Sequence, residues 1–305
     1  MGNIINGLFN PENTFFQIAK ESKRLTHISL SSLILPVIFL AIAGVLTQFV
    51  FVPLFLGDPE QAANWVRQAF RLYVMFGLGA IIIFLWVRFF EGRSTRTLGF
   101  TKPDFLKKYF SGFLMGVLMN TIVVALIALW GNVEVATQST NLTGINSIGI
   151  VIIFLFGFII QGASEEILSR GWMMQVIGAR YWPWLGVLIS TILFTILHLG
   201  NAGVNLISVL NLLLFALLMV LFVMKDGSLW SACAWHSAWN WMLGNVYGLS
   251  VSGSGEKVSI FDLNTTGNEL ISGGNFGPEG SLITTFVLFI FIIFYGVKII
   301  KKARK

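Results

Sequence analysis

The hydrophobic positions of this chain fall in long continuous runs and do not alternate with polar ones. Eight such runs are separated by polar segments, at residues 31–56, 72–90, 112–130, 148–178, 182–199, 203–224, 228–247 and 281–299. A helix needs about 20 residues to cross the core of a bilayer. Continuous runs favour helices, because a backbone in lipid must satisfy its hydrogen bonds internally. We therefore predict an all-α, polytopic integral membrane bundle of about eight transmembrane helices.

Two of the runs depart from the length of a simple span. The run 148–178 would form a helix about 46 Å long, well beyond the roughly 30 Å bilayer core. It is expected to tilt, to protrude, or to break at Gly162 or Gly171. The run 182–199 is slightly short. The third run opens with Gly112 and Gly116, whose spacing permits close contact with a neighbouring helix.

The composition agrees with a membrane protein. The chain is 55% hydrophobic and 11% charged, whereas a soluble domain has about 25% charged residues. The net charge of +6 is explained by lysine and arginine in the loops, so no binding of nucleic acid is expected. The single cysteine, Cys233, excludes an intramolecular disulfide and a multi-cysteine metal site.

The loop charges predict the orientation in the membrane. The loop from Arg88 to Lys108 and the tail from Lys298 to Lys305 are rich in lysine and arginine, whereas the loop 131–147 has Glu134 and no basic residue. Basic loops face the cytoplasm. We therefore expect a multi-pass protein of the cell (plasma) membrane with both termini in the cytoplasm.

The chain is expected to have four parts. Residues 1–30 form a cytoplasmic amphipathic segment, 31–147 the first three helices, 148–247 the core with the candidate chemistry, and 248–305 an outer loop, the last helix and the basic tail. The loop 248–280 is rich in Gly, Ser and Asn, which favours a flexible linker over a lid.

The first 30 residues carry three further expectations. Phe15, Phe16 and Ile18 would form a short helix in the membrane interface, the alternative being a mobile tail. No cleavable signal peptide is evident. Asn6 departs from the Ser or Thr of the myristoylation pattern, so this modification is not expected.

Ionisable residues gather inside the predicted core. Such groups cost roughly 2.5–3.5 kcal/mol each in a membrane helix, so a cluster of them favours a functional site. Glu165, Glu166 and Arg170 lie on one run. Residues four apart share a helix face, so Arg170 should pair with Glu166 and leave Glu165 free. The alternative for these three residues is a structural salt bridge at the end of a span.

A predicted hairpin brings His198 to the level of Glu165. Glu165 precedes Arg180 by 15 residues, and His198 follows Pro183 by 15. Each arm is then about 22 Å long, which sets the two side chains at one depth. Phe194 lies one turn before His198 and could form a wall of the site. A histidine at the end of a span can also be a satisfied interfacial residue.

The seventh run adds His236 and Asn240, again four residues apart. Both side chains offer N–H donors that can hold a developing oxyanion, or they form an interhelical hydrogen-bonded pair. With Glu165 as base and His198 sharing its water, the set suits the addition of water to a carbonyl. A thiol–imidazole pair of Cys233 and His236 is disfavoured, because no orienting partner is apparent.

These motifs resemble a known family. Glu-Glu-x-x-x-Arg at 165–170, Phe-x-x-x-His at 194–198 and His-x-x-x-Asn at 236–240 are similar to those of the CPBP family of intramembrane endopeptidases. That family includes type II CAAX prenyl endopeptidases and bacteriocin-processing or self-immunity proteins. The likeness covers roughly residues 148–245. Ser169 stands where an aromatic residue is often found, a departure that concerns packing.

The resemblance implies a role for each matching residue. Glu165 would activate water with the help of His198, His236 and Asn240 would stabilise the oxyanion, and Glu166 and Arg170 would order the site. No cofactor is expected, although zinc bound by Glu165, His198 and His236 stays open. The metal-free glutamate mechanism is favoured, because the Glu–His pair and Asn240 already account for the chemistry.

The expected activity is an intramembrane endopeptidase that cuts a membrane-associated protein or peptide near the cytoplasmic half of the bilayer. The alternative is a non-catalytic membrane scaffold or bacteriocin-immunity protein of the same fold. A transporter using the buried carboxylates would predict inverted repeats, and none is detected. The substrate, any recognition of prenyl groups and the oligomeric state are not defined by the sequence.

Overall fold

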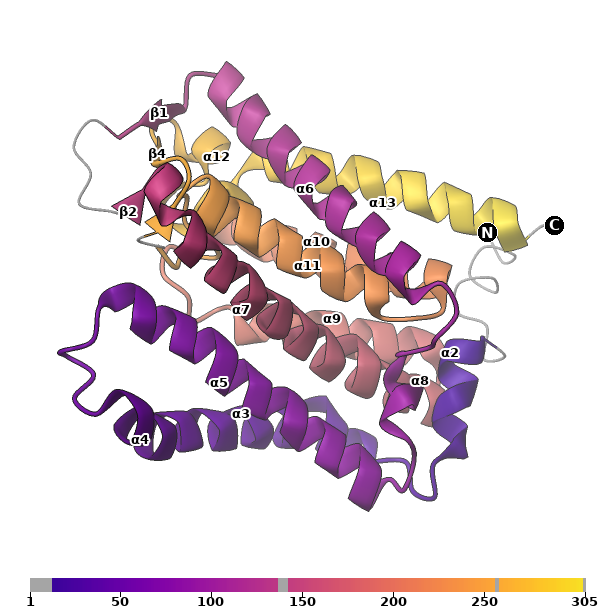
Figure 1. Ribbon diagram of the computed structural model, residues 1–305. Coiled ribbons are helices and arrows are strands. Elements are labelled where there is room, and N and C mark those ends of the chain that lie inside the picture. The colour runs from indigo at the N-terminus through magenta and orange to yellow at the C-terminus, as the bar shows by residue number, and fades with distance from the viewer. Residues whose placement is uncertain (1–12, 137–141, 256–257, 304–305) are drawn as a thin grey trace.

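The computed structural model describes residues 13–136, 142–255 and 258–303, and these form a bundle of helices with two small pairs of strands (Figure 1). The helices are α2 Thr14–Gln17, α3 Leu35–Leu46, α4 Val52–Leu56, α5 Asn64–Leu85, α6 Phe105–Leu129, α7 Ile148–Glu166, α8 Gln175–Arg180, α9 Pro183–Leu197, α10 Leu206–Asp226, α11 Trp230–Trp241, α12 Glu269–Ser272 and α13 Leu282–Ala303. The predicted all-α fold is confirmed.

Six helical stretches in the described ranges are long and apolar enough to cross a membrane: Leu30–Leu56, Asn64–Phe90, Phe105–Leu129, Ile145–Arg180, Leu206–Asp226 and Leu282–Lys301. The protein is therefore a multi-pass membrane protein. The other two predicted spans are shorter helices. Pro183–Leu197 has 15 residues, and α11 has 12 residues before five π-helical ones that end at Val246.

The longest apolar run forms one continuous helical stretch and does not break at Gly162 or Gly171. α7 passes into a π-helical segment, Ile167–Met174, which leads directly into α8. A π-helix is rare and is found mostly at functional sites. This segment follows directly on Glu165 and Glu166 and contains Arg170, so the widened turns lie where the ionisable residues gather.

Close helix contact holds α11 in the centre of the bundle. A Cβ atom on Gly112 or Gly116 of α6 would overlap the backbone of Ser231 or Trp235 of α11. The contact predicted from the spacing of these two glycines is confirmed. Gly162 of α7 meets Ser237 in the same way on another side of α11. α11 is thus pressed between α6 and α7, which fixes the height of the side chains it presents.

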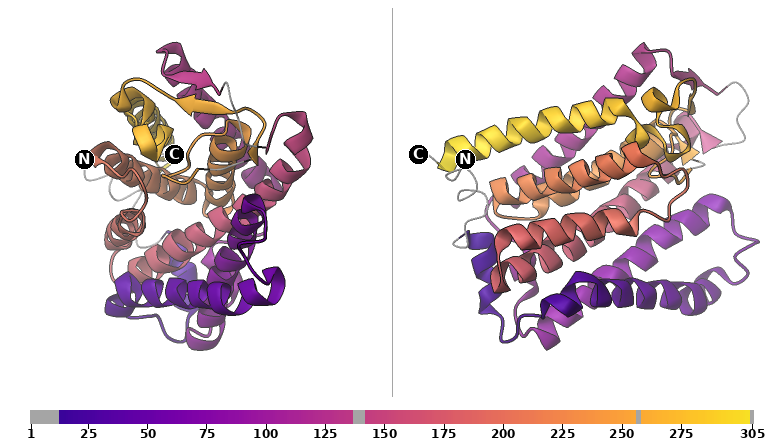
Figure 2. Two further views of the ribbon diagram at one scale, coloured as in Figure 1. Left: turned by 90° about the vertical axis from the view of Figure 1, so that its left-hand side faces the viewer. Right: turned by 180° about the vertical axis from the view of Figure 1, so that it is seen from behind.

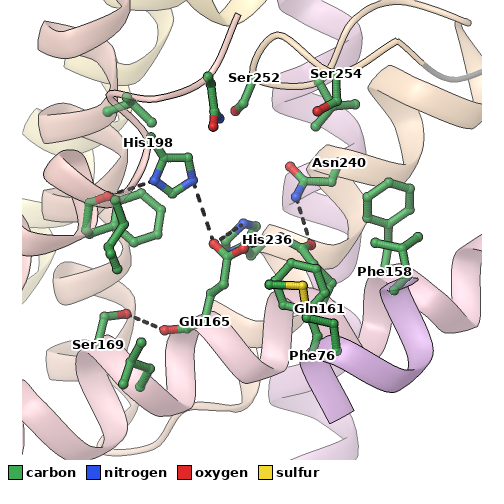
Figure 3. Close-up of a pocket in the computed structure, with 18 of the residues that line it drawn as sticks. Phe76, Phe158, Gln161, Glu165, Ser169, His198, His236, Asn240, Ser252 and Ser254 are labelled. Carbon is green, nitrogen blue, oxygen red and sulfur yellow. Dashed lines mark hydrogen bonds and ion pairs between the residues drawn. The ribbon is translucent and has the colours of Figure 1, made fainter. Parts of the chain in front are cut away.

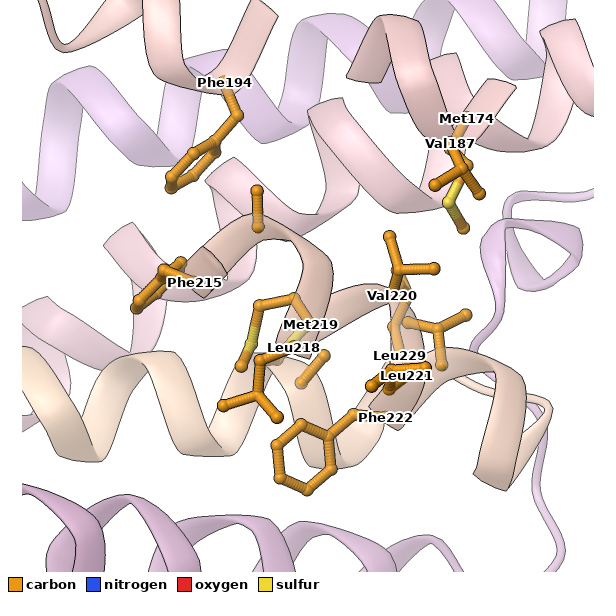
Figure 4. Packing of buried hydrophobic residues seen from close by; sticks show 14 of the residues in the cluster. Met174, Val187, Phe194, Phe215, Leu218, Met219, Val220, Leu221, Phe222 and Leu229 are labelled. Atoms are coloured by element: carbon orange, nitrogen blue, oxygen red, sulfur yellow. The ribbon is translucent and has the colours of Figure 1, made fainter. Parts of the chain in front are cut away.

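The main hydrophobic core surrounds α10. Figure 4 shows Phe215, Met219 and Phe222 of this helix among neighbours from other elements. Phe194 of α9 stacks on Phe215 with ring centroids 5.5 Å apart. The ring of Trp235 of α11 makes an edge contact with Phe215, with centroids 5.1 Å apart. Aromatic packing therefore joins α9, α10 and α11 at one level of the bundle.

The two ends of the bundle differ in structure. α2, α8 and the last turns of α13 lie at one end, and the strands with α12 lie at the other (Figures 1 and 2). β1 Val133–Val135 pairs antiparallel with β4 Leu263–Thr265, and β2 Leu142–Thr143 pairs parallel with β3 Val258–Ser259. The basic loop 88–108 lies at the end with α2, opposite the strands.

The loop 248–280 is not the plain linker that its composition predicts. Besides β3, β4 and α12, it is held to the bundle by buried amides. Asn245 Nδ2 donates to the carbonyl oxygen of Val258 at 2.7 Å. Asn211 Nδ2 of α10 donates to the carbonyl oxygens of Glu279 and Ser281, both at 2.8 Å. These long-range hydrogen bonds hold the loop in one position, although its content of Gly and Ser suggests flexibility.

The prediction that Phe15 and Phe16 lie in the membrane interface is wrong. Both side chains are buried in the protein, at 1% and 0% exposure. Phe16 packs against Gly178 of α8, and Phe15 packs against Gly99. The carbonyl oxygen of Phe15 accepts a hydrogen bond from Gln175 Nε2 at 2.7 Å. The myristoylation pattern at residues 1–6 and the tail residues Arg304 and Lys305 lie outside the described residues.

Candidate active site

A cavity of about 550 Å³ lies between α5, α7, α9, α10 and α11, beneath the loop 248–280 (Figure 3). Its polar lining includes all four residues that the sequence analysis proposed for the chemistry: Glu165, His198, His236 and Asn240. They come from α7, the end of α9, and α11. The fold therefore brings together residues that are up to 75 positions apart in the chain.

The Glu165 carboxylate faces both histidines. Its Oε2 atom lies 3.7 Å from His236 Nε2 and 3.9 Å from His198 Nε2. These separations are longer than direct hydrogen bonds and fit a site where one water contacts all three groups. Its Oε1 atom accepts a hydrogen bond from Gln161 Nε2 at 2.5 Å. Glu165 is thus held through one oxygen and offers the other to the cavity.

Glu166 and Arg170 form a buried ion pair behind the cavity. Arg170 Nη1 lies 3.1 Å from Glu166 Oε1, and both side chains have 0% exposure. The same Glu166 oxygen accepts from His236 Nδ1 at 3.0 Å. Because a carboxylate only accepts, His236 carries its proton on Nδ1. The ion pair therefore fixes the ring of His236 with Nε2 turned toward Glu165.

The orientation of His198 is set by the end of α9. It is the residue that follows the last helical position, Leu197. Its Nδ1 atom lies 2.7 Å from the carbonyl oxygen of Phe194. A carbonyl oxygen only accepts, so Nδ1 bears the hydrogen and a neutral ring presents the Nε2 lone pair to the cavity. The tautomer of His198 is therefore determined by the carbonyl oxygen of Phe194. The backbone N–H of His198 does not use that oxygen and donates to Thr195 instead.

Asn240 is oriented by Gln161, a residue that the sequence analysis missed. Asn240 Nδ2 donates to Gln161 Oε1 at 3.0 Å, and Gln161 in turn donates to Glu165. A polar residue one turn before Glu165 in an apolar helix was a signal that could have revealed it. Gln161 thus connects the carboxylate on α7 with the carboxamide on α11.

Phe194 forms a wall of the cavity. Its ring lies 4.6 Å from the ring of His198 and 5.5 Å from that of Phe215. The Arg170 guanidinium lies over the same ring, with its central carbon 4.6 Å from the centroid of Phe194. Phe194 thus contacts the buried cation as well as the His198 ring, and the second contact restricts how His198 can turn.

Comparison with protein families identifies the region that contains this site. Residues 147–242 match the family model described as type II CAAX prenyl endopeptidase Rce1-like. This core is similar to the Rce1-like family. The match includes all three motifs and confirms the resemblance to the CPBP family. Since that is a family of proteases, it supports peptidase activity. No curated protein and no solved structure matches the chain.

The cavity of the Rce1-like core reaches the end of the bundle that carries the strands. Ser252, Ser254 and Gly255 of the outer loop line it, together with Glu279. Glu279 accepts hydrogen bonds from Trp239 Nε1 at 2.9 Å and from the Ser252 hydroxyl at 2.8 Å. Glycine and serine composition did not reveal this contact. The cavity therefore extends toward the end of the bundle opposite the basic loop 88–108.

The sequence also raised a cysteine nucleophile and a metal site as candidates. Cys233 is a free, buried cysteine and does not line the cavity beside His236. Within the described ranges, no group of three or more His, Cys, Asp or Glu side chains has an arrangement that could hold a metal ion. Glu165, His198 and His236 meet at one point, but each also has a protein contact that sets its orientation.

Proposed function

We propose that this protein is an intramembrane endopeptidase that hydrolyses a peptide bond of a membrane-associated protein or peptide with water activated by Glu165. One observation carries the proposal: Glu165 Oε2 lies in a cavity between the Nε2 atoms of His198 and His236, at 3.9 and 3.7 Å. The family match supports peptidase activity, and the contacts of each residue suggest its role.

Glu165 and His198 orient the attacking water. The Oε2 atom of Glu165 and the Nε2 lone pair of His198 are both acceptors, so each can take one hydrogen of the same water. The oxygen lone pairs of that water are then directed away from the two side chains, toward a bound carbonyl carbon. Glu165 takes the proton as the C–O bond forms, which is general base catalysis.

His236 and Asn240 stabilise the oxyanion. Because His236 Nδ1 donates to Glu166, the ring can donate through Nε2 only as an imidazolium. Two ionised glutamates and Arg170 leave one negative charge uncompensated, and a cationic His236 makes the buried cluster neutral. One N–H of Asn240 is bonded to Gln161, and its second N–H is available for the oxyanion.

The proton then returns to the substrate. As the tetrahedral intermediate collapses, the C–N bond breaks and the protonated Glu165 gives its proton to the leaving amine nitrogen. The products are a carboxylic acid and an amine, which become a carboxylate and an ammonium group by proton transfer between them, and the cluster regains its starting charge. No covalent intermediate with the enzyme is formed, so neither Ser169 nor Cys233 takes part as a nucleophile.

The cavity opens, in this proposal, on the side of the membrane away from the cytoplasm. The basic loop 88–108 and the end of α13 lie at the opposite end of the bundle from the strands. Basic loops stay in the cytoplasm, so the termini are cytoplasmic and the loop 248–280 is outside. A substrate segment then reaches Glu165 from the outer surface of the plasma membrane.

The test of catalysis is Glu165→Gln in purified protein reconstituted in lipid, with a mixed-sequence peptide library analysed by mass spectrometry. General base catalysis contributes about 10²- to 10⁴-fold, so cleavage should fall by that factor while thermal stability changes little. Cys233→Ser is the matched control and should cleave normally. Full activity of Glu165→Gln would remove the glutamate mechanism and favour the non-catalytic scaffold.

The orientation is tested separately by labelling cysteines with a membrane-impermeant maleimide in intact cells. Cys233 is the only cysteine of the chain and is buried, so it gives a silent background. We expect Ser254→Cys to react and Arg96→Cys, at the other end, to react only after lysis. Both positions are exposed in the fold. The reverse pattern would place the cavity mouth in the cytoplasm.

A further inference from the structure

A positively charged group lies at the rim of the cavity, away from the catalytic residues. Among the described residues, Arg71 is the one lysine or arginine that lines the cavity. It belongs to α5, and its side chain is exposed. Ser252, Ser254 and Gly255 of the outer loop line the same cavity. A substrate segment that enters past this loop therefore passes near the guanidinium.

The polar atoms of this rim are not used within the protein. No hydrogen bond or ion pair joins Arg71 to another side chain or carbonyl in the described part of the chain. Gln68, one turn earlier, donates to the carbonyl oxygen of Gly255 at 3.3 Å, and its buried Oε1 atom has no partner among the described residues. A cation and an amide are thus available together at the mouth.

Arg67 on the same helix provides the contrast. Its guanidinium donates to the carbonyl oxygen of Pro59 at 2.7 Å and also to Asn64 Oδ1. It does not line the cavity. Arg67 therefore holds the turn before α5, and a structural role accounts for it. The same explanation does not apply to Arg71, which lines the cavity and has no acceptor among the described residues.

The packing of α5 on α7 sets how far Arg71 lies from Glu165. Leu72 and Tyr73 lie against Gly157, and Gly79 lies against Ser164, so the two helices run in the same direction. Arg71 is therefore near the level of Gly157, eight residues before Glu165, an axial offset of about 12 Å. An extended peptide spans this distance with about three to four residues.

We propose that Arg71, with Gln68, forms a subsite for a carboxylate of the substrate, about three to four residues from the bond that is cut. The guanidinium binds carboxylates through a fork of two N–H donors. The carboxylate is either the C-terminus of the substrate or an Asp or Glu side chain. This inference rests on the proposed function, since it concerns the substrate of the same site.

Binding tests the subsite without relying on catalysis. The probe is one dansyl-labelled apolar hexapeptide in three forms: with a free C-terminal carboxylate, with a C-terminal amide, and as the amide with an internal Asp. Affinity is measured by fluorescence anisotropy on the Glu165→Gln protein in phosphatidylcholine nanodiscs. A hydrogen bond to a charged group is worth about 10- to 100-fold, so a carboxylate form should bind better than the plain amide by that factor.

Matched variants then assign the preference to Arg71. In the Glu165→Gln background, Arg71→Gln should reduce the difference between the carboxylate and amide forms to about twofold or less, and Arg71→Lys should retain part of it. Arg67→Gln should leave it unchanged. If Arg71→Gln weakens binding of the free-acid peptide, the carboxylate is the C-terminus. If it weakens binding of the amide with the internal Asp, the carboxylate is a side chain.

Three results would overturn the subsite. One is equal binding of acid and amide by the parent protein. Another is a preference that survives in Arg71→Gln. The third is an effect of Arg71→Gln that occurs only when phosphatidylglycerol is added to the nanodiscs, which would assign Arg71 to lipid headgroups. If peptides bind with the expected preference but no library peptide is cleaved, the proposed function fails and the subsite stands.

Discussion

Two buried glutamate–arginine pairs of this protein differ in how their polar atoms are used. The Glu91–Arg93 pair, at the end of the bundle with the basic loops, has an N–O distance of 2.8 Å. The Glu166–Arg170 pair behind the cavity has one of 3.1 Å. All four side chains have 0% exposure. Burial and pairing therefore do not distinguish a structural pair from one that belongs to an active site.

The Glu91–Arg93 pair is the centre of a nearly complete hydrogen-bond network. Glu91 Oε1 accepts from Thr26 Oγ1 at 2.6 Å and from Trp172 Nε1 at 3.0 Å. Arg93 Nη1 donates to Gln175 Oε1 at 2.6 Å. One atom of the pair, Arg93 Nη2, has no partner within the described residues. The network joins segments distant in the chain, and none of its residues lines the cavity.

The site pair and its neighbour Glu165 leave more atoms free. Glu165 Oε2, Glu166 Oε2, and Arg170 Nε and Nη2 have no hydrogen-bond partner in the described part of the protein. Unbonded buried polar groups are costly, at about 1–3 kcal/mol each. Among these residues Glu165 lines the cavity, so its Oε2 atom can accept a hydrogen bond from a group that enters. The two pairs are equally buried but differ in how many of their polar atoms are hydrogen-bonded within the protein. That difference, more than burial, distinguishes the structural pair from the pair at the site.

The largest expected effect tests the structural side of this comparison. Glu91→Gln leaves Arg93 as an unpaired buried charge, which costs about 3–5 kcal/mol. Thermal unfolding of the purified protein should report that loss, while cleavage per folded molecule stays unchanged. Glu60→Gln, an exposed glutamate, is the control for removal of one charge. A selective loss of activity with normal stability would assign Glu91 to the catalytic machinery.

The next effect concerns the proposed oxyanion donors. Removal of one such donor lowers kcat by about 10²- to 10³-fold, and this is expected of Asn240→Ala. KM should change much less, because the donor acts on the transition state. Steady-state kinetics with a peptide substrate separates the two constants. A rise in KM at constant kcat would instead give Asn240 a role in substrate binding.

A smaller effect is expected from Gln161, which positions Glu165 and Asn240. Gln161→Leu removes two hydrogen bonds, each worth about 0.5–1.5 kcal/mol. The two hydrogen bonds orient catalytic groups, so kcat should fall by about 10-fold, and Gln161→Glu should recover little, because it places a carboxylate beside that of Glu165. If Gln161→Leu lowers only thermal stability, the residue is a packing element.

The smallest expected effect is that of metal removal. The proposed mechanism needs only the side chains and water, so extended dialysis against EDTA or 1,10-phenanthroline should leave kcat within experimental error. Recovery with added Zn²⁺ after a loss would assign Glu165, His198 and His236 as ligands.

The sequence by itself determined the helices and the local pairs. Continuous apolar runs specify spans, because the backbone must be satisfied within each segment. The spacing of Glu166 and Arg170 specifies an ion pair, and equal arms about the turn at Pro183 bring His198 to Glu165. The glycines at 112 and 116 predicted a close helix contact. All of these follow from helical periodicity over short distances along the chain.

Only the tertiary structure decided the surroundings of the site. The hydrogen bond of Gln161 to Asn240 joins residues 79 positions apart, and that of His236 to Glu166 joins residues 70 apart. The position of the loop 248–280 over the cavity depends on Asn211 and Glu279. The burial of Phe15 depends on the glycine and helix packed against it. Such contacts depend on how distant segments pack, which local periodicity does not specify.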